Sequence, residues 1–489
     1  MWFPAIGKSA VASRIHIASR IGLEILRDGG NAFDAAIATS AVLSLVIPHT
    51  GGLGGDAFII ARLSNGEVKA YNGSGKSPKD FPVDEFIESR PRRGGLTVSV
   101  PGLVDTWIYV YEEYSSMDLG RILQPAISLA ENGFYTPLQL VNAVYKLRDE
   151  LSNFRSWMRT YGRLDMPGYH RFRRFAKVLR RISRRGWDGF YSGGVAESIV
   201  QQLNEEGAPI SEEDFEGHRG VEVDPLKIDY NGFTVYELPP NTQGLTTLEI
   251  LKLMDLSGLD NVERDEKWWE SYFKIALKAY IDRDTYLGDP DYMDVNPYTL
   301  LSEPHLKNYI SSLRLEGGDT TFFVVGDSYG NIVGFIQSLF HPFGSGLVAE
   351  EIPFQNRLIG FRLEKGYPNS PAPQKRPLHT LSILLAENVR EYILVGCAGG
   401  DLRPQIHTQV FSNIVDRGMG LAEAVSAPRG MLLEWSSGVK AVVEKGIPGG
   451  YREIPYPSNY VGVVQALRSR DGVVEAYADP RGGGVALSI

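Results

Sequence analysis

The sequence predicts a mixed α/β protein with a helix-rich amino-terminal part and a strand-rich carboxyl-terminal part. Apolar residues recur at helical spacing over residues 17–26, and residues 35–46 form a nearly continuous apolar run of helical length. From residue 320 onward, short apolar runs alternate with turn residues, which is typical of strands. The 489 residues leave room for about two to four domains or for one large α/β unit.

Two helices are expected near the start of the chain. Gly29 and Gly30 follow the first apolar stretch and predict its end, because glycine is common just after a last helical turn. Asn31 then occupies an N-cap position, and Asp34 is placed to complete a capping box. Because residues 35–46 are apolar on nearly all sides, we expect the second helix to be buried.

A glycine-rich loop and a hairpin are expected next. In the loop at residues 51–55 the backbone must pass close to another part of the molecule. Residues 57–63 and 68–71 are predicted to pair as strands around a turn at Asn65-Gly66. The middle of the chain, residues 102–315, is expected to be mostly helical.

A second hairpin opens the strand-rich part. Residues 321–325 and 332–339 are apolar runs that flank the turn-forming residues 326–331. The remaining elements expected here are strands at 392–395 and 461–467, a helix at 421–425 and an irregular segment at 344–376. Long irregular segments often frame a binding site.

The charge balance argues against a nucleic-acid partner. Fifty basic and 59 acidic side chains give a net charge of −9, whereas phosphate binding needs a basic surface. Residues 171–185 form a basic amphipathic segment that would suit a membrane surface or RNA, but a solvated helix face is the favoured interpretation.

Location and redox context follow from two further features. Cys397 is the only cysteine, so no intrachain disulfide can form. The chain shows no secretory pattern at its start and no apolar stretch of membrane-spanning length, so we expect a cytoplasmic protein without a membrane partner.

Two hydroxyls face each other in the second hairpin. If the turn centres on Tyr329, Thr320 lies opposite Ser338, and alternation places both side chains on one face of the sheet. Cross-strand hydroxyl pairs also occur as ordinary sheet stabilisers. Taken alone, this pair therefore favours a structural interpretation over a catalytic one.

Gly399 and Gly400 follow the expected strand at 392–395. Adjacent glycines in this position can direct two backbone N–H groups to one point, as in an oxyanion hole, or can simply form a tight turn. The eight histidines show no paired metal-ligand spacing, and the loop at 51–55 lacks the lysine of a phosphate-binding loop. We therefore assign no cofactor and no metal.

An ordered set of motifs resembles the γ-glutamyltransferase family of N-terminal-nucleophile hydrolases. Residues 318–327 (GDTTFFVVGD) resemble the autoprocessing motif of that family. The further matches, in chain order, are GNAFDAA (30–36), PHTGGLGG (48–55), VPG (100–102), QPA (124–126), GFY (189–191), PPNTQG (239–244), GNIV (330–333), FGSG (343–346), KRPLHT (375–380), GG (399–400), APR (427–429) and DPRGG (479–483). Each motif is weak alone, but the ordered set is highly specific.

The resemblance implies a fold and a processing step. Members of the family have a four-layer αββα sandwich, and their precursors cut themselves. Here the cut would fall between Asp319 and Thr320, leaving a large piece (1–319) and a small piece (320–489) that stay associated as a heterodimer, with a dimer of heterodimers left open.

The resemblance also assigns catalytic roles. Thr320 would become both the first residue of the small piece and the nucleophile, with its own α-amine, which titrates near ~7.7–8.0, as the base. Ser338 takes the place of a hydroxyl that hydrogen-bonds the nucleophile, and Gly399 and Gly400 take the place of the oxyanion pair. Thr321 is expected to support the nucleophile.

The polar groups with which the family grips a substrate are mostly replaced. The family's carboxylate-binding arginine aligns with Ser74, and the aspartate that pairs with the substrate amine falls at Gly360. Arg357 stands where a neutral amide is usual and can supply a displaced anion contact. The remaining changes are an asparagine to Phe340 and a serine pair to His379-Thr380.

The pattern is closer to a divergent subgroup that includes oxamate amidohydrolase. We expect a small-molecule amide substrate held by Ser74, Arg357, His379 and Thr380. Three hypotheses follow: a hydrolase or transferase acting on γ-glutamyl compounds such as glutathione, a hydrolase of another small acidic amide such as oxamate, and an unprocessed, inactive binding or scaffold protein.

Overall fold

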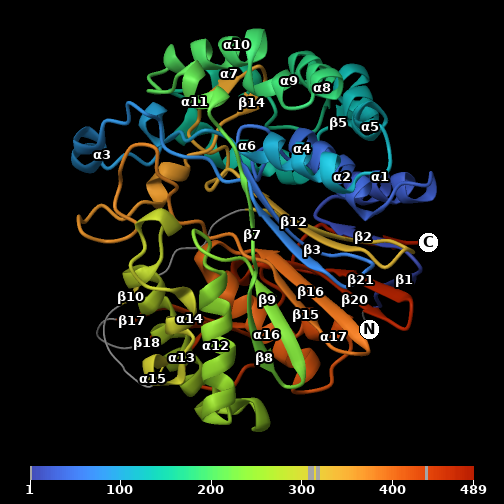
Figure 1. The fold of residues 1–489 in the computed structure, drawn as a ribbon, viewed down its shortest axis with the longest axis vertical. Coiled ribbons are helices and arrows are strands. Elements are labelled where there is room, and N and C mark those ends of the chain that lie inside the picture. Colours follow the sequence, from blue (N-terminus) through green and yellow to red (C-terminus); the bar gives the residue numbers. More distant parts are fainter. Residues whose placement is uncertain (1–2, 307–312, 315–319, 436–438) are drawn as a thin grey trace.

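The computed structural model describes residues 3–306, 313–314, 320–435 and 439–489. Two seven-stranded sheets are stacked face to face, and helices cover the outer face of each (Figure 1). This is the four-layer αββα arrangement that the family resemblance implies. Segments from before and after residue 320 contribute strands to both sheets, so neither sheet is complete without both parts of the chain.

The first sheet contains the hairpin that carries Thr320. Its strands, in spatial order, are β22 (Val485–Ser488), β2 (Ala10–Ser13), β11 (Thr321–Gly326), β12 (Ile332–Ser338), β3 (Asp56–Arg62), β4 (Val68–Asn72) and β7 (Val221–Val223). β11 pairs with β12 so that Thr321 lies opposite Gln337 and Gly326 opposite Ile332. The register predicted from a turn centred on Tyr329 is therefore confirmed.

The second sheet supplies the glycine pair. Its strands, in spatial order, are β1 (Ala5–Gly7), β21 (Val473–Ala478), β20 (Val463–Arg470), β16 (Glu391–Ala398), β15 (Leu384–Glu387), β9 (Phe233–Glu237) and β8 (Leu226–Tyr230). Smaller sheets are formed by β10 (Leu313–Arg314) with β17 (Gly430–Trp435), β18 (Val439–Glu444) and β19 (Arg452–Ile454), by β13 (Val348–Ala349) with β14 (Ile352–Pro353), and by β5 (Phe134–Tyr135) with β6 (Tyr169–His170).

Helices form the two outer layers. The layer on the first sheet contains α1 (His16–Arg27), α2 (Ala32–Val46), α4 (Leu103–Tyr114), α5 (Leu119–Asn132), α6 (Leu138–Leu151), α7 (Arg155–Thr160), α8 (Arg173–Arg185), α9 (Asp188–Tyr191), α10 (Gly193–Asn204) and α11 (Glu212–Glu216). The layer on the second sheet contains α12 (Gly244–Ser257), α13 (Glu266–Tyr286), α14 (Pro297–Leu300), α15 (Glu303–Leu306), α16 (Arg403–Val415) and α17 (Leu421–Ser426). α3 (Val83–Ser89) packs beside Leu358 and Phe361 through Phe86.

Three large hydrophobic clusters separate the four layers. The middle one contains Phe322 and Ile336 from the first sheet and Leu394 and Leu467 from the second. Alternation sends Phe323 of β11 to the opposite face, against the first helical layer. Both faces of the hairpin are therefore buried, which fixes its register because a one-residue slip would exchange the two faces.

Most local expectations near the start of the chain are confirmed. α1 and α2 cover the two predicted helices, and every residue of α2 is buried. Asn31 accepts hydrogen bonds from the backbone N–H groups of Phe33 and Asp34, while the Asp34 carboxylate accepts one from Asn31 N. This is the capping box that the sequence predicts.

Two features were not expected from the sequence. Residues 102–315 are mostly helical, as predicted, but β8 and β9 form a hairpin at one edge of the second sheet. β8 alternates buried and exposed residues, a strand signal that the helical surroundings concealed. The strand-rich part also contains α16, which is buried along nearly its whole length and so lacks the amphipathic pattern of a surface helix.

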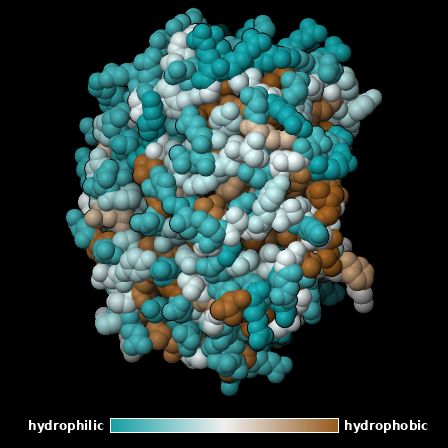
Figure 2. All heavy atoms as spheres, turned by 45° about the vertical axis from the view of Figure 1, so that its right-hand side comes forward, coloured by the Kyte–Doolittle hydropathy of each residue, from teal (hydrophilic) through white to brown (hydrophobic). Residues whose placement is uncertain are grey.

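The basic segment belongs to an ordinary surface helix. α8 buries Phe175, Leu179 and Ile182 on one face, and Arg180 of its polar face pairs with Glu131. The favoured interpretation, a solvated helix face, is confirmed. Within the described residues, no helix is both long and apolar enough to cross a membrane. The face shown in Figure 2 is mostly hydrophilic, with hydrophobic residues appearing between polar ones.

The glycine-rich loop lies against the end of β12. Gly55 donates to Gly52 O (2.8 Å), and its own carbonyl accepts from the N–H groups of Gly102 and Leu103. A Cβ added at Gly55 would lie closer to Ser338 O than van der Waals contact allows. The loop therefore needs glycine there because the backbone of Ser338 passes directly beside it.

We predict that Gly55→Ala destabilises the protein by about 1–3 kcal/mol, because the added methyl group pushes against the backbone that holds Ser338. Thermal unfolding followed by circular dichroism measures the effect. Gly52→Ala is the matched control, because a Cβ there would lie an ordinary 3.5 Å from Ser44 O. Equal melting temperatures for the two variants would contradict the close approach.

Candidate active site

Thr320 and Ser338 meet where the hairpin opens. The Thr320 side chain is 1% exposed, and its Oγ1 donates to Ser338 Oγ at 3.3 Å. Ser338 Oγ also accepts the backbone N–H of Phe340 at 2.9 Å, and Arg14 Nη1 donates to Thr320 O at 2.6 Å. The predicted pair is therefore in hydrogen-bond contact. Asp319, the other side of the predicted cut, lies outside the described residues.

Thr321 faces the opposite side of the sheet from Thr320. Its Oγ1 shares a hydrogen bond with Thr50 Oγ1, and Thr50 Oγ1 also donates to Ile47 O at 3.0 Å. Thr50 lies just before the glycine-rich loop. This contact ties the first residue of β11 to the loop that passes Ser338. The supporting role expected for Thr321 stays a prediction.

Gly399 and Gly400 form the turn that leaves β16. Gly400 has φ +55°, a backbone conformation that suits glycine. Gln243 Nε2 donates to Gly400 O (2.9 Å) and to Thr380 O (2.6 Å), so one amide holds both segments together. Gln243 is in turn held by Arg283, whose Nη1 donates to Gln243 Oε1 at 3.0 Å.

A cavity of about 770 Å³ opens beside these groups. Gly400, Thr380 and Phe340 line it together, so it reaches the glycine turn and the residue bonded to Ser338. The charged residues along its wall are Arg90, Arg92, Arg283, Asp284, Arg362, Glu364 and Asp401. Its size suits a small molecule.

Asp56 and His379 form a fully buried pair behind Ser338. Asp56 lies directly opposite Ser338 in the β3–β12 register. Its Oδ1 accepts from the N–H groups of Gly75 (3.1 Å) and Gly102 (3.0 Å), and its Oδ2 lies 2.9 Å from His379 Nε2. These donors leave the Asp56 carboxylate with partners on both oxygens.

The two members of this pair have opposite electrostatic surroundings. Burial opposes the charged form of Asp56, but the hydrogen bond from His379 and the charge of Arg357 hold its pKa below the usual value. Burial, followed by the charge of Arg357, lowers the pKa of His379 to about 4. His379 is therefore neutral at neutral pH, donating from Nε2 to an ionised Asp56.

Arg357 lies at the start of a short 3₁₀ turn (Arg357–Gly360) and is fully buried. Its guanidinium carbon stands 4.3 Å from the centre of the Phe340 ring. None of its three side-chain nitrogens has a hydrogen-bond partner among the described residues. Burial lowers the pKa of Arg357 to about 9, so it remains a cation at neutral pH.

Ser74 sits apart from the cavity wall. Its buried hydroxyl donates to Asn72 Oδ1 at 2.6 Å and lies within 3.4 Å of the Asn241 side chain. Of the four residues expected to bind substrate, Thr380 lines the cavity, and Arg357 lies behind its wall. His379 is buried against Asp56, and the binding roles of all four residues stay predictions.

Sequence reasoning missed several groups at this site. Asp56 directly follows the glycine-rich loop, and an acidic residue at the start of an apolar strand is a signal that was available. Arg14 is 306 residues from Thr320 in the chain, and Arg403 begins a helix that was not expected. No local pattern identifies these two.

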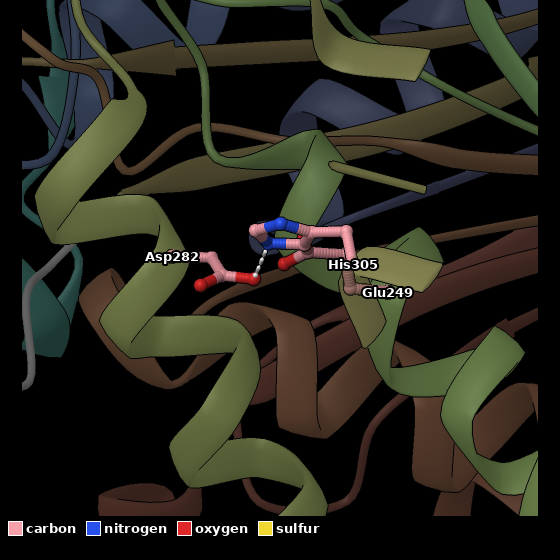
Figure 3. A group of neighbouring side chains, drawn as sticks. All are labelled: Glu249, Asp282 and His305. Carbon is pink, nitrogen blue, oxygen red and sulfur yellow. Dashed lines mark hydrogen bonds and ion pairs between the residues drawn. The ribbon is translucent and has the colours of Figure 1, made fainter. Parts of the chain in front are cut away.

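A second polar group lies between α12, α13 and α15. Glu249, Asp282 and His305 point toward one another (Figure 3), and all are residue types that can bind metals. Lys278 donates to Asp282 and lies 3.3 Å from His305 Nε2, so the group contains its own cation. Burial and then Asp282 hold the pKa of Glu249 well above its usual range, which favours its neutral form. We attribute the group to helix packing.

Comparisons with known proteins cover nearly the whole chain. The family model for γ-glutamyltranspeptidase matches residues 18–489. The glutathione hydrolase-like YwrD proenzyme of Bacillus subtilis (strain 168) is 33% identical, over 99% of this chain and 98% of that protein. The oxamate amidohydrolase proenzyme of Klebsiella pneumoniae is 30% identical, over 96% of both chains.

A solved structure agrees over the same length. Cephalosporin acylase from Bacillus halodurans superposes with a TM-score of 0.91 at 28% identity, covering 100% of this chain and 97% of that one. The family match, the two full-length relatives and this common fold all support the same family assignment. The chain belongs to the γ-glutamyltranspeptidase family of N-terminal-nucleophile hydrolases and is an enzyme of the hydrolase and transferase type.

Proposed function

We propose that the protein cuts itself before Thr320 and then cleaves a small acidic amide through an acyl-enzyme on that threonine. The observation that carries this proposal is the contact between Thr320 Oγ1 and Ser338 Oγ. Phe340, whose N–H is bonded to Ser338 Oγ, lines a cavity together with Gly400. A hydroxyl is a weak nucleophile without a neighbouring base, and a free amine on Thr320 supplies one. Processing and activation are then the same event.

The proposed reaction has two steps, formation of an ester on Thr320 and its cleavage. Thr320 Oγ1 attacks the amide carbon while its proton passes to the α-amine, and negative charge develops on the carbonyl oxygen beside Gly399 and Gly400. The C–N bond breaks, the amine leaves with that proton, and an ester to Thr320 remains. Water, or an amino acceptor in transfer, attacks the ester and restores the free hydroxyl.

The acyl donor has two candidate classes. The first class is γ-glutamyl compounds such as glutathione, and the Bacillus subtilis relative is named glutathione hydrolase-like. The second class is another small acidic amide such as oxamate, which is named for the Klebsiella relative. Arg357 favours an anionic donor in either case, because it is a buried cation behind the cavity wall.

The two pieces are proposed to remain one heterodimer after cleavage. β11 and β12 of the small piece lie between β2 and β3 of the large piece, and in the second sheet β21 and β15 of the small piece lie beside β1 and β9 of the large piece. Separation would expose both sheets and the core between them. A cytoplasmic location belongs to the same proposal.

Replacement of Thr320 by alanine is expected to leave a single chain near 54.1 kDa and to lower turnover about 10⁴-fold or more, because the attacking oxygen is gone. Intact mass and a denaturing gel measure scission, and an amide panel measures turnover. Thr320→Ser keeps a hydroxyl and should still process. Two fragments from Thr320→Ala at the same junction would rule out this assignment.

The pH dependence of kcat/KM should identify the base. We expect one acid limb near pH ~7.7–8.0, since the amine of Thr320 must lose its proton before it can accept another. His379, with its pKa near 4, is neutral across pH 5–9 and should not contribute to that limb. His379→Asn should therefore keep the midpoint, and a shifted midpoint in this variant would contradict the amine as base.

A further inference from the structure

A second cavity lies in the helical layer on the first sheet, at the top of Figure 1. It has a volume of about 360 Å³ and is bounded by α7, β6, the start of α8, α10 and the turn between β13 and β14. It shares no lining residue with the cavity beside Gly400, so the two are separate. Its volume falls within the range of small-ligand sites. The titratable residues on its wall are Arg159, His170, Arg171, Arg174 and Glu351.

Three guanidinium groups from different segments meet at this cavity. Arg159 belongs to α7, Arg171 precedes α8, and Arg174 lies in the first turn of α8. Arg171 uses only its Nε, which donates to Asn132 O at 3.0 Å. The side chains of Arg159 and Arg174 make no hydrogen bond or ion pair within the described part of the chain. The cavity therefore has several N–H donors available for a ligand.

The acidic residues on the surrounding segments are held by other groups. Glu131 of α5 pairs with Arg180 at 2.6 Å, and Asp165, between α7 and β6, pairs with Arg148. Glu350, in the turn between β13 and β14, accepts hydrogen bonds from two neutral side chains of α10. None of these carboxylates lines the cavity. The fold thus directs its nearby acids away from the three arginines on the wall.

Glu351 supplies the carboxylate found among the described lining residues. Its Oε2 accepts the backbone N–H groups of Arg174 (2.8 Å) and Phe175 (3.3 Å), so it caps the start of α8. Burial raises the pKa of Glu351, and these two N–H groups oppose the rise. Burial lowers the pKa of His170, which leaves its ring neutral at neutral pH. Three guanidinium groups and at most one carboxylate give the wall a net charge of at least +2.

We propose that this cavity binds the phosphate group of a small phosphate monoester. Such a group carries a charge of about −1.5 to −2 near pH 7, which matches the charge of the wall. Its oxygens suit the forked donors of guanidinium groups, which bind phosphate in a bidentate manner. A single carboxylate would bring only half of that charge. The volume of the cavity leaves room for the organic part of the ester, and free phosphate shares the same recognition chemistry.

Calorimetric titration of the processed protein at constant ionic strength tests this ligand class. Glucose 6-phosphate and inorganic phosphate are the probes, and gluconate, a carboxylate of similar size, is the control. Tighter binding of glucose 6-phosphate identifies a monoester as the ligand, and equally tight binding of inorganic phosphate identifies free phosphate. Either result supports the phosphate site. Binding of neither probe at millimolar concentration, or equal binding of gluconate, overturns it.

Paired arginine variants separate the cavity from general surface charge. Arg159→Gln/Arg174→Gln removes two charges from the wall, whereas Arg163→Gln/Arg173→Gln removes two from neighbouring exposed positions that do not line the cavity. The Kd of the tighter-binding probe should rise about tenfold or more in the first variant and less than about twofold in the second, because only the first loses direct phosphate contacts. An equal loss of affinity in both variants overturns the proposal.

The Thr320→Ala variant makes this test independent of the proposed catalytic step. Its Kd for the same probe should equal that of the wild-type protein, because Thr320 does not line this cavity. Both double arginine variants should still cut before Thr320 as the wild-type protein does. If no amide is hydrolysed but phosphate still binds, the amidohydrolase proposal fails and the phosphate site stands. Loss of phosphate binding in Thr320→Ala would place the ligand at the nucleophile and overturn the phosphate site.

Discussion

The pairing of β11 with β12 is the constraint on which the site depends. Both faces of the hairpin are buried, one between the sheets and one under the first helical layer, so its register is fixed. That register leaves Thr320 just outside the ladder and within 3.3 Å of the Ser338 hydroxyl. The glycine-rich loop can pass beside Ser338 only because Gly55 has no side chain. The packing of the hydrophobic core therefore fixes the position of Thr320, without any contribution from the other catalytic groups.

Behind this hairpin the protein concentrates charge in a buried region. Asp56 is ionised and its partner His379 is neutral, which is the arrangement that leaves the fewest unpaired charges around the pair. Arg357 and Arg403 differ from this pair, because both have buried guanidinium nitrogens without hydrogen-bond partners among the described residues. A fold rarely retains such groups for stability alone, and Arg357 lies against Phe340, which lines the small-molecule cavity.

Different parts of the site were accessible to sequence reasoning to different degrees. The contact of Thr320 with Ser338 followed from counting outward from the turn, because strand pairing is a regular and local pattern. The glycine turn at Gly400 followed from its place after a strand. The strands β8 and β9 were missed although β8 has the alternation of a strand, because helices surround them in the sequence. The helix α16 was missed because it is buried on nearly all sides and lacks an amphipathic pattern.

The sequence by itself determined the mixed α/β class, the capping box of α2, the hairpin register and, through its ordered motifs, the family. The fold class, the capping box and the register depend on residues that lie close together in the chain. The family assignment depends on short motifs of consecutive residues. Only the tertiary structure decided that Asp56 meets His379 and that Arg14 reaches Thr320. It also decided that Arg357 lies behind Phe340 with no hydrogen-bond partner among the described residues. The physical reason is that burial and charge pairing depend on contacts between distant segments, which no local periodicity records.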